Sequence, residues 1–345
     1  MLASILVALL VLELGCRLVI GGPAALLDWH NLVLASRVAA GRGWQAELQS
    51  AYAYDPVLGF VNRPGFRSTR TSFDADGFRV RPRLGDAAEA APPILATGDS
   101  FTKGEEVADV ETWPADLQRL LDRPTINAGV GAYGLDQTVL MTERAVKLVK
   151  PGQLVLGFIA DDVQRRDEMS RMWGRDKPFF EETATGPALR NVPVPHPADP
   201  RDTLSFLQAA FGWSMLLDTV LDRLLLRDEW HTDNVRAVPE GTGERLACPL
   251  LRRIAALGVP TLVVAQYLPS AWRYPDTAAQ ERRTAALVLD CARRLGFATV
   301  DTYEPFDDAI RSGDVEAVFG QWHPNAHGYR IIAEAIAAEL RRRPP

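Results

Sequence analysis

Cysteine is scarce in this sequence of 345 residues, which contains only Cys16, Cys248 and Cys291. Three cysteines are too few for a disulfide-built scaffold, and none of them stands in a CxxC pair. Cys248 and Cys291 are candidates for one disulfide. The alternative is that both are free buried thiols, which behave as small apolar side chains.

A basic stripe is also absent. The formal net charge is −6, and the sequence therefore gives no reason to expect a nucleic acid as partner. The composition, 47% hydrophobic and 24% charged residues, is that of a globular protein and excludes a disordered chain. The length suits one large domain with additions, or two small domains.

The N-terminal segment, residues 1–22, is nearly all apolar and reads MLASILVALLVLELGCRLVIGG. Its two charges, Glu13 and Arg17, are spaced i,i+4 with the acid first, so they can pair on one helix face. The run approaches the ~20 residues that a bilayer-spanning helix needs. We expect a single-pass membrane anchor here, with a buried core helix as the alternative. No basic n-region and no A-x-A site is present, which argues against a cleaved signal peptide.

Residues 23–90 lack a regular pattern and are expected to form a linker followed by a small β-rich preamble. Residues 23–50 read as a polar helix or linker. In residues 51–90, aromatic residues, glycine, proline and threonine recur without helical period, which predicts short strands and turns, with a loop over 81–93.

From residue 91 to residue 341, short apolar runs alternate with amphipathic segments. Strand-like runs occupy residues 94–97, 124–130, 153–160, 259–267 and 297–303. Helical spacing occurs over residues 110–121, 135–149, 243–256, 277–295 and 325–340. Strands separated by helices pair in parallel with helices on both faces, so we expect a three-layer α/β/α sandwich with about five parallel strands and flavodoxin-like winding.

The stretch at about 164–240 interrupts this alternation. It contains a proline-rich, loop-like segment at 177–200 and a strongly apolar segment at 204–226 that predicts one helix. We interpret the stretch as an insertion in the α/β domain that forms either a lid or substrate wall, or a packing helix with its connector.

Polar residues follow several of the predicted strands, at the sheet edge where parallel α/β folds bind ligands. Ser100 follows the first strand, and His323 follows the last. Histidine can take the proton that makes a serine hydroxyl nucleophilic, and backbone amides can stabilise the resulting oxyanion. Taken alone, Ser100 is as well explained as a helix N-cap. The arrival of His323 at the same edge favours a nucleophile, with His327 as a less favoured base.

Four blocks in this order resemble those of the SGNH, or GDSL, hydrolases. They are GDSFTKGEEV (98–107), NAGVGAYGLDQ (127–137), GFIADD (157–162) and HPNAHGYRIIAEAI (323–336). The resemblance covers roughly residues 90–340. It implies an SGNH hydrolase fold and serine esterase activity, with Ser100 as nucleophile, His323 as general base, and the second oxyanion amide at Gly131 or Ala132. The segments YDPVLGFVNRPGF (54–66) and DGFR (76–79) after an apolar N-terminus are similar to membrane-attached bacterial members.

Two positions depart from the family pattern. Asp161 stands where an asparagine normally donates to the oxyanion, and an ionised carboxylate can only accept hydrogen bonds. Gly320 stands three residues before His323, where the family has an aspartate. An acid from another loop is then needed to orient His323, or the pair works as a dyad. The candidate acids are Asp162, Asp301 and Asp314.

The carboxylates near Ser100 have further interpretations. Asp99 is expected to fix the turn before the serine. Asp161 and Asp162 are expected either to cap the next segment or to pair with Arg165 and Arg166. With Asp99 they could hold a divalent cation, but no spacing is diagnostic, and neither a metal nor a cofactor is expected.

The resemblance implies an ester substrate, either O-acylated cell-envelope carbohydrate or lipid. It also implies a catalytic domain outside the cytoplasm, attached to the membrane by residues 1–22, although Arg37 and Arg42 mildly disfavour export of this side. One alternative is a catalytically inactive SGNH-like domain that binds envelope polysaccharide or a protein partner. Another is an O-acyltransferase that uses the same Ser100 and His323. The oligomeric state is not indicated.

Overall fold

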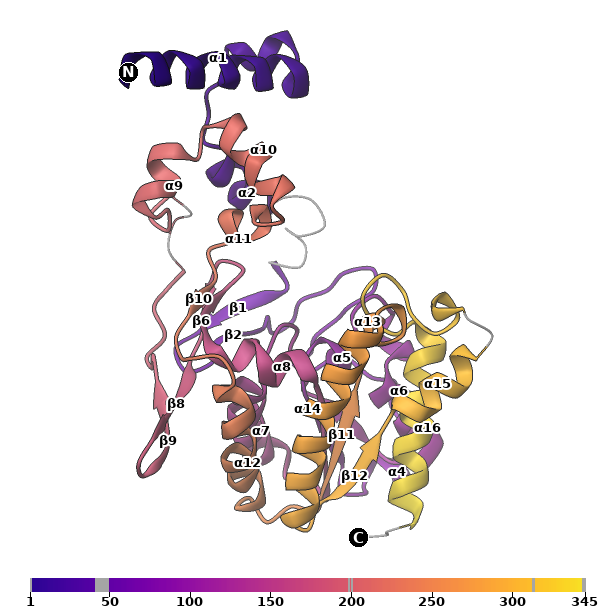
Figure 1. Cartoon of the computed structure of the whole chain (residues 1–345). Helices are drawn as coiled ribbons and strands as arrows, with labels where there is room; N and C mark the ends of the chain where they lie inside the picture. The colour runs from indigo at the N-terminus through magenta and orange to yellow at the C-terminus, as the bar shows by residue number, and fades with distance from the viewer. Residues whose placement is uncertain (1, 41–49, 198, 200, 312–313, 343–345) are drawn as a thin grey trace. The chain divides into compact units, whose positions relative to one another are not determined.

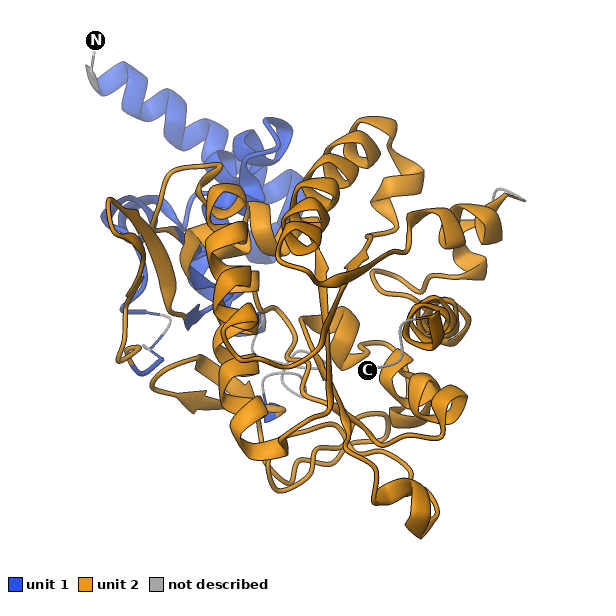
Figure 2. Cartoon of the chain, turned by 90° about the horizontal axis from the view of Figure 1, so that it is seen from below, with its two compact units in different colours: residues 1–50, 171–176, 196–235 blue, residues 51–170, 177–195, 236–345 orange. Residues whose placement is uncertain are grey.

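The computed structural model describes residues 2–40, 50–197, 199, 201–311 and 314–342. The chain divides into two compact units (Figure 2). The smaller unit comprises residues 1–50, 171–176 and 196–235, and the larger comprises residues 51–170, 177–195 and 236–345. The larger unit contains the central sheet and all the candidate site residues. The expected insertion at 164–240 is divided between the two units.

The central sheet has five strands in the order β4-β3-β5-β11-β12, and every neighbouring pair is parallel. Figure 1 labels its strands β11 and β12. The bounds of the five strands are β3 Ile94–Thr97, β4 Thr125–Asn127, β5 Gln153–Ile159, β11 Thr261–Gln266 and β12 Ala298–Asp301. Counted along the chain this order is 2-1-3-4-5, the flavodoxin-like winding. The predicted parallel α/β fold is confirmed, and each predicted strand run contains one observed strand.

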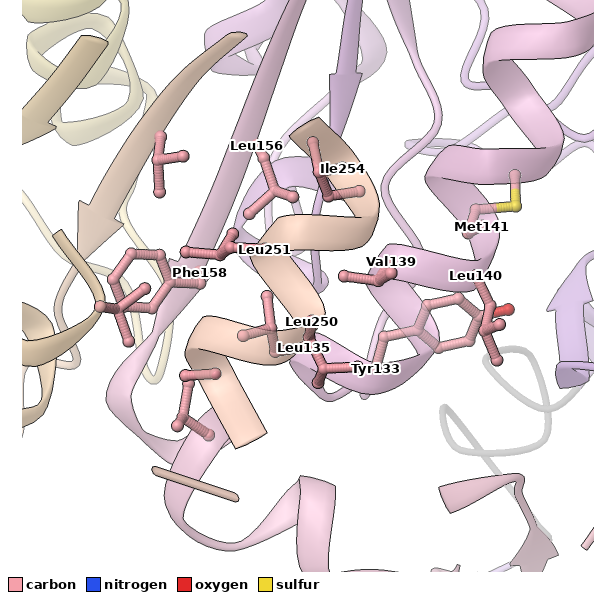
Figure 3. Packing of buried hydrophobic residues seen from close by; sticks show 14 of the residues in the cluster. Tyr133, Leu135, Val139, Leu140, Met141, Leu156, Phe158, Leu250, Leu251 and Ile254 are labelled. Carbon is pink, nitrogen blue, oxygen red and sulfur yellow. The ribbon is translucent and has the colours of Figure 1, made fainter. Parts of the chain in front are cut away.

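Helices cover both faces of this sheet, because successive strand residues point to opposite sides. Leu95, Leu156 and Val263 belong to one buried cluster, together with side chains of three helices. Figure 3 shows part of this cluster, including Leu156. These helices are α7 Leu135–Val149, α12 Thr242–Ala255 and α14 Pro275–Arg294. The alternate residues, such as Ile94 and Val155, pack on the opposite face against α6 Trp113–Leu121, α15 Tyr303–Ile310 and α16 Ala326–Arg342.

The preamble contains an antiparallel hairpin of β1 (Tyr52–Asp55) and β2 (Gly59–Asn62), as the predicted short strands and turns require. A short helix, α4 (Asp86–Glu89), lies within the loop predicted over 81–93. Arg81 binds both carboxylate oxygens of Glu89 at 2.7 Å. This ion pair adds to a helical turn that its alanines and first-turn aspartate already favour.

The proline-rich segment 177–200 was predicted as a loop, but it contains the antiparallel hairpin of β8 (Phe179–Thr183) and β9 (Gly186–Arg190). Phe180 pairs across this hairpin with Leu189, and both pack on the core of the larger unit. A buried apolar cross-strand pair of this kind stabilises the hairpin. The sequence did not indicate these two strands because each is five residues long and prolines lie within and around them.

The apolar segment 204–226 was predicted as one helix, but it forms two, α9 (Phe206–Phe211) and α10 (Met215–Arg223). Gly212 ends the first helix, and the Ser214 hydroxyl accepts a hydrogen bond from the Leu217 amide at 3.1 Å as the N-cap of the second. A glycine, and a serine two residues later, end one helix and start the next, so these caps divide the apolar segment.

The apolar N-terminal segment forms helix α1 (Leu2–Gly21), which by length and composition is able to cross a membrane; a signal sequence has the same profile. Glu13 and Arg17 form the expected pair at 2.7 Å, and both are buried within the smaller unit. The Glu13 carboxylate also accepts the Met215 and Leu216 amides at 3.0 and 2.9 Å, so it binds the first turn of α10.

The remaining elements are short. They are η1 Pro23–Leu26, α2 Leu32–Ala40, α5 Ser100–Lys103, η2 Asp109–Glu111, α8 Ala160–Gln164, η3 Arg166–Glu168, β6 Met169–Met172, β7 Arg175–Asp176, α11 Arg227–His231, β10 Val235–Arg236, α13 Ser270–Arg273 and η4 Val315–Ala317. Within the expected helix or linker at 23–50, residues 41–49 and hence Arg42 lie outside the described residues.

A disulfide joins Cys248 on α12 to Cys291 on α14, so two helices on the same face of the sheet are covalently linked. Replacing both cysteines by alanine should lower the free energy of unfolding by about 2–4 kcal/mol, because the unfolded chain regains the freedom of a long loop. Urea unfolding under non-reducing conditions measures this change. The Cys16→Ala variant, which removes a free thiol, is the matched control. An unchanged urea midpoint in the double variant would show that the bridge contributes nothing.

Candidate active site

Ser100 lies where β3 ends, as the first residue of helix α5. The N-cap of this helix is Asp99 and not Ser100, because the Asp99 carboxylate accepts the hydrogen bond from the Phe101 amide at 3.0 Å. The N-cap interpretation of Ser100 is therefore wrong. Asp99 is the N-cap and fixes the turn before the serine, as expected. The serine hydroxyl lies 3.4 Å from Asp99 Oδ2 and also faces a side chain from another loop.

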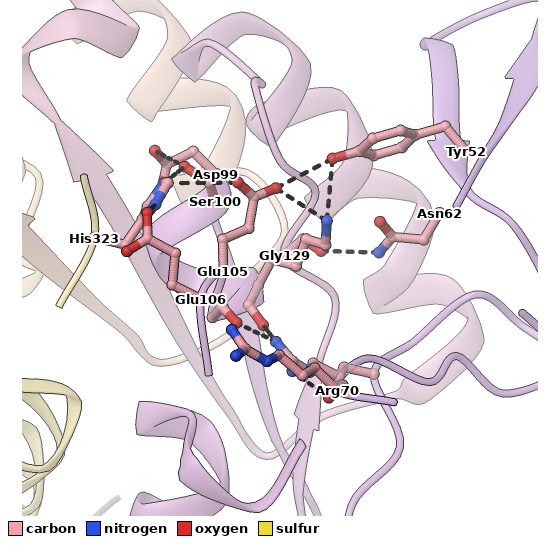
Figure 4. Close-up of polar contacts among 12 residues, drawn as sticks. Tyr52, Asn62, Arg70, Asp99, Ser100, Glu105, Glu106, Gly129 and His323 are labelled. Carbon is pink, nitrogen blue, oxygen red and sulfur yellow. Dashed lines mark hydrogen bonds and ion pairs between the residues drawn. The ribbon is translucent and has the colours of Figure 1, made fainter. Parts of the chain in front are cut away.

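That side chain is His323, which precedes α16. Its Nε2 lies 2.9 Å from Ser100 Oγ (Figure 4). The imidazole ring also packs against the Phe101 ring, with centroids 5.1 Å apart. The less favoured base, His327, is in the first turn of α16, where its Nδ1 is 3.3 Å from the Ala317 carbonyl oxygen. The structure therefore brings together the serine and the histidine that the sequence favours.

The other nitrogen of His323, Nδ1, lies 3.0 Å from Oε1 of Glu106. The Glu106 carboxylate also accepts hydrogen bonds from the backbone amides of Gln321 and Trp322, at 2.8 and 3.1 Å. Burial raises the pKa of Glu106, but the hydrogen bond and charge of His323 and these two amides outweigh it, so the pKa lies below its usual range. The imidazole is thus held between a hydroxyl and a carboxylate.

The acids considered from the sequence do not occupy this place. Asp162 accepts the Ile159 amide at 3.1 Å, and Asp301 accepts the Tyr303 amide at 3.0 Å. Within the described ranges, none of Asp162, Asp301 and Asp314 contacts His323.

A second carboxylate, that of Glu105, lies on the Ser100 side of the imidazole, with Oε2 3.7 Å from His323 Nε2. Its Oε1 accepts a hydrogen bond from Lys103 Nζ at 3.0 Å, and Lys103 also donates to the Tyr52 hydroxyl at 3.1 Å (Figure 4). Burial opposes ionisation of Glu105, but the charge of the buried Lys103 outweighs it and lowers the pKa of Glu105 to about 2. A fixed negative charge therefore faces the serine and histidine.

The glycine-rich turn after β4 fits closely against this group. A Cβ on Gly131 would lie 2.3 Å from both Glu105 Oε1 and the Tyr52 hydroxyl, so a side chain at this position would displace these two groups. Ala132 follows with φ of 67°, a left-handed conformation that is uncommon for alanine. Asn62 of the preamble supports the turn by donating to the Gly129 carbonyl at 2.9 Å.

The loop that carries Glu105 and Glu106 is held by Arg79, from the DGFR segment of the preamble. The buried guanidinium donates to the carbonyls of Lys103 and Val107, at 2.6 and 2.7 Å, and to the Gly104 carbonyl. Its Nε binds Asp109 at 2.8 Å. The preamble is therefore part of the site's support.

Asp161 lies in α8, where Arg165 binds both of its carboxylate oxygens at 2.8 and 2.7 Å and Arg166 Nε binds one at 2.9 Å. Burial raises the pKa of Asp161, but the attraction of Arg166 and the hydrogen bonds of both arginines lower it overall. Asp161 is therefore an ionised acceptor without a proton to donate.

Arg166 links the three aspartates that the sequence suggested as cation ligands. Its Nη1 is 3.1 Å from Asp162 Oδ1 and 3.6 Å from Asp99 Oδ2. Burial, together with the neighbouring Asp99 charge, raises the pKa of Asp162 well above its usual range. The positive partner of this cluster is a guanidinium, and no metal-binding arrangement of His, Cys, Asp or Glu occurs in the part of the chain that the structure describes.

The sequence analysis missed Glu105, Glu106, Lys103, Tyr52 and Arg79. It sought the orienting acid at strand ends, whereas Glu106 follows Ser100 by six residues in the same loop. The glycine at position 320, where the family has an aspartate, was the one indication in the sequence, because it meant that any orienting acid had to come from another loop. No local pattern identifies Tyr52 or Arg79, whose partners are distant in the sequence.

The chain is similar to several proteins of known structure. Solved structures similar to it include LAE5, an alpha/beta hydrolase from the metagenome of Lake Arreo, at 17% identity over 74% of this chain and 97% of that chain, with a TM-score of 0.45. A catalytic mutant of Axe2, an acetylxylan esterase from Geobacillus stearothermophilus, matches at 13% identity over 73% and 95%, with a TM-score of 0.45. A lipolytic G-D-S-L family protein from Veillonella parvula matches at 13% over 73% and 100%, with a TM-score of 0.43.

No curated protein matches the sequence. The model of the GDSL-like lipase/acylhydrolase family matches residues 96–331, which contain both Ser100 and His323. The family resemblance of the four sequence blocks is thereby confirmed. The chain belongs to the GDSL-like lipase/acylhydrolase family and is an ester-hydrolysing enzyme.

Proposed function

We propose that this protein is an SGNH-type serine esterase that removes acyl groups from O-acylated carbohydrate or lipid of the cell envelope. Ser100 is the nucleophile and His323 is the general base. The observation that carries the proposal is the 2.9 Å separation of Ser100 Oγ and His323 Nε2, which lies within the range for an activated serine.

In the first step, His323 Nε2 takes the proton of Ser100 as Oγ forms a bond to the ester carbonyl carbon. The tetrahedral intermediate collapses when the bond to the alcohol oxygen breaks, and the imidazolium returns the proton to that alcohol. A water molecule then attacks the acyl-serine in the same way, with His323 again as base. The acid leaves and Ser100 regains its proton.

The oxyanion is assigned to backbone amides, those of Ser100 and of Gly131 or Ala132. Among the described residues, no backbone carbonyl accepts a hydrogen bond from any of these three amides. Asp161 gives no donor in place of the family's asparagine, because it is ionised and bound by Arg165 and Arg166. Amide groups held in a rigid turn can stabilise the developing charge without reorganisation.

Two features support action outside the cytoplasm. The apolar helix α1 is suited to a membrane anchor, and a disulfide such as Cys248–Cys291 persists mainly in oxidising compartments. A hydrolase anchored there has acylated envelope carbohydrates and lipids as its nearest esters.

The charge of Glu105 limits which esters fit. Because its carboxylate lies beside the reacting pair, an acyl group that carries its own negative charge would be repelled, whereas a short neutral acyl group would not. We therefore assign neutral acyl esters to this site.

The Ser100→Ala variant tests the nucleophile. With p-nitrophenyl acetate, kcat/KM should fall at least about 10³-fold, because no side chain replaces the attacking oxygen. Labelling by a fluorophosphonate probe should be lost as well.

The Ser205→Ala variant makes the same change at an exposed helix cap and should retain both the activity and the labelling. Equal activity and labelling in wild type and Ser100→Ala would eliminate Ser100 as nucleophile. A folded wild type that shows neither would favour a binding domain.

The Glu105→Gln variant tests the preference for neutral esters. Wild type should hydrolyse p-nitrophenyl acetate much faster than the p-nitrophenyl monoester of succinic acid, and this ratio should fall by about tenfold in the variant, equivalent to the ~1.4 kcal/mol of one charge interaction. With a pKa of about 2, Glu105 stays ionised, so the wild-type ratio should be constant from pH 8 to about pH 6, where the succinate carboxylate is ionised too. Glu182→Gln, which removes an exposed charge paired with Arg245, is the control. An unchanged ratio in Glu105→Gln would refute the charge argument.

A further inference from the structure

His323 lacks the acid that its own loop would carry in the family pattern, yet a carboxylate still contacts its Nδ1. We propose that Glu106 is the positioning residue for His323. We also propose that the Glu106 side chain fits here because Gly320 has no side chain of its own. In this chain the acid that contacts the histidine therefore stands on the serine loop. This assignment rests on the proposed esterase function, because it concerns how the general base is oriented.

The contacts of Glu106 fix both the ring and the loop that bears it. Oε1 accepts from His323 Nδ1 at 3.0 Å and from the Trp322 amide at 3.1 Å, while Oε2 accepts from the Gln321 amide at 2.8 Å. With the proton on Nδ1 donated to Glu106, Nε2 presents its lone pair to Ser100 Oγ. An orienting carboxylate performs this task in a serine triad.

A side chain at position 320 and the Glu106 carboxylate would exclude one another sterically. A Cβ built on Gly320 would lie 2.3 Å from Glu106 Oε2 and 3.6 Å from its Cδ. Any side chain at position 320 would therefore project into the space that the Glu106 carboxylate fills. The same geometry means that an aspartate at position 320 would bring its carboxylate to this space if Glu106 were removed.

The backbone around Glu106 is built to hold it. Glu106 has φ of 68°, in the left-handed region that is unfavourable for a side chain of this size. Arg79 binds carbonyls on both sides of it, at Gly104 and Val107, and the Tyr329 hydroxyl donates to the Glu105 carbonyl at 3.3 Å. Such strain persists where surrounding contacts over-determine the conformation, most often at functional sites.

The neighbouring Glu105 cannot take this role. Its Oε2 lies 3.7 Å from Nε2, the nitrogen that faces Ser100, and its Oε1 is bound by Lys103 and lies 3.4 Å from the Tyr52 hydroxyl. The two adjacent glutamates therefore flank opposite sides of one imidazole, and only Glu106 contacts Nδ1.

A relocation experiment tests the assignment with four full-length variants: Glu106→Gln, Glu106→Ala, Gly320→Asp, and the Glu106→Ala/Gly320→Asp double variant. Glu106→Gln and Glu106→Ala should lower kcat for p-nitrophenyl acetate by roughly 10²–10⁴-fold with KM changed less than about threefold, because orientation of the base is lost while ester binding remains. The double variant should regain at least about tenfold over Glu106→Ala. Gly320→Asp alone should be less active than wild type, because two carboxylates then compete for one space.

The Glu111→Gln variant, five residues further along the same segment, is the matched control and should keep its kcat within about twofold. Thermal unfolding establishes that each variant is folded. Full kcat in Glu106→Gln overturns the positioning role, and so does a folded double variant no more active than Glu106→Ala. These outcomes are distinct from failure of the esterase proposal, in which wild type itself is inactive and is not labelled by fluorophosphonate.

Discussion

The buried guanidinium of Arg79 holds together the segment on which the reacting groups depend. Its hydrogen bonds to the carbonyls of Lys103, Gly104 and Val107 satisfy backbone acceptors that would otherwise be buried without partners, at a cost of about 1–3 kcal/mol each. The segment begins with the serine helix and continues through the two glutamates that flank His323. Arg79 belongs to the preamble, so the part of the chain before the hydrolase blocks shapes the site.

The charged side chains of the site form separate ion-paired groups. Arg166 is shared by Asp99, Asp161 and Asp162, and Lys103 is paired with Glu105. Glu106 differs, because its side-chain partner is the imidazole itself. In the proposed reaction His323 becomes positively charged when it takes the serine proton. The carboxylate then gains a full ion pair in the transition state, where stabilisation accelerates the reaction.

The fold could be read from the sequence because its strands and helices have clear periods, and β3 was predicted at its observed bounds. Ser100 and His323 could be proposed from the sequence because each stands in a recognisable block. The division of 204–226 into α9 and α10 and the hairpin β8–β9 were not found, since caps and cross-strand pairs outweighed the apolar pattern. Glu106 was not predicted for another reason. Its carboxylate has space because Gly320, more than two hundred residues away in the sequence, lacks a side chain, and only the folded chain brings the two positions together.

The glycine at position 320 also affects how relatives of this protein are judged. A search that accepts an enzyme only when an aspartate stands three residues before the histidine would class this chain among proteins that have lost their activity. In this chain, however, the Glu106 carboxylate contacts the imidazole from the opposite loop and fills the space beside Gly320. The lack of an aspartate at position 320 therefore does not leave the histidine without a carboxylate partner.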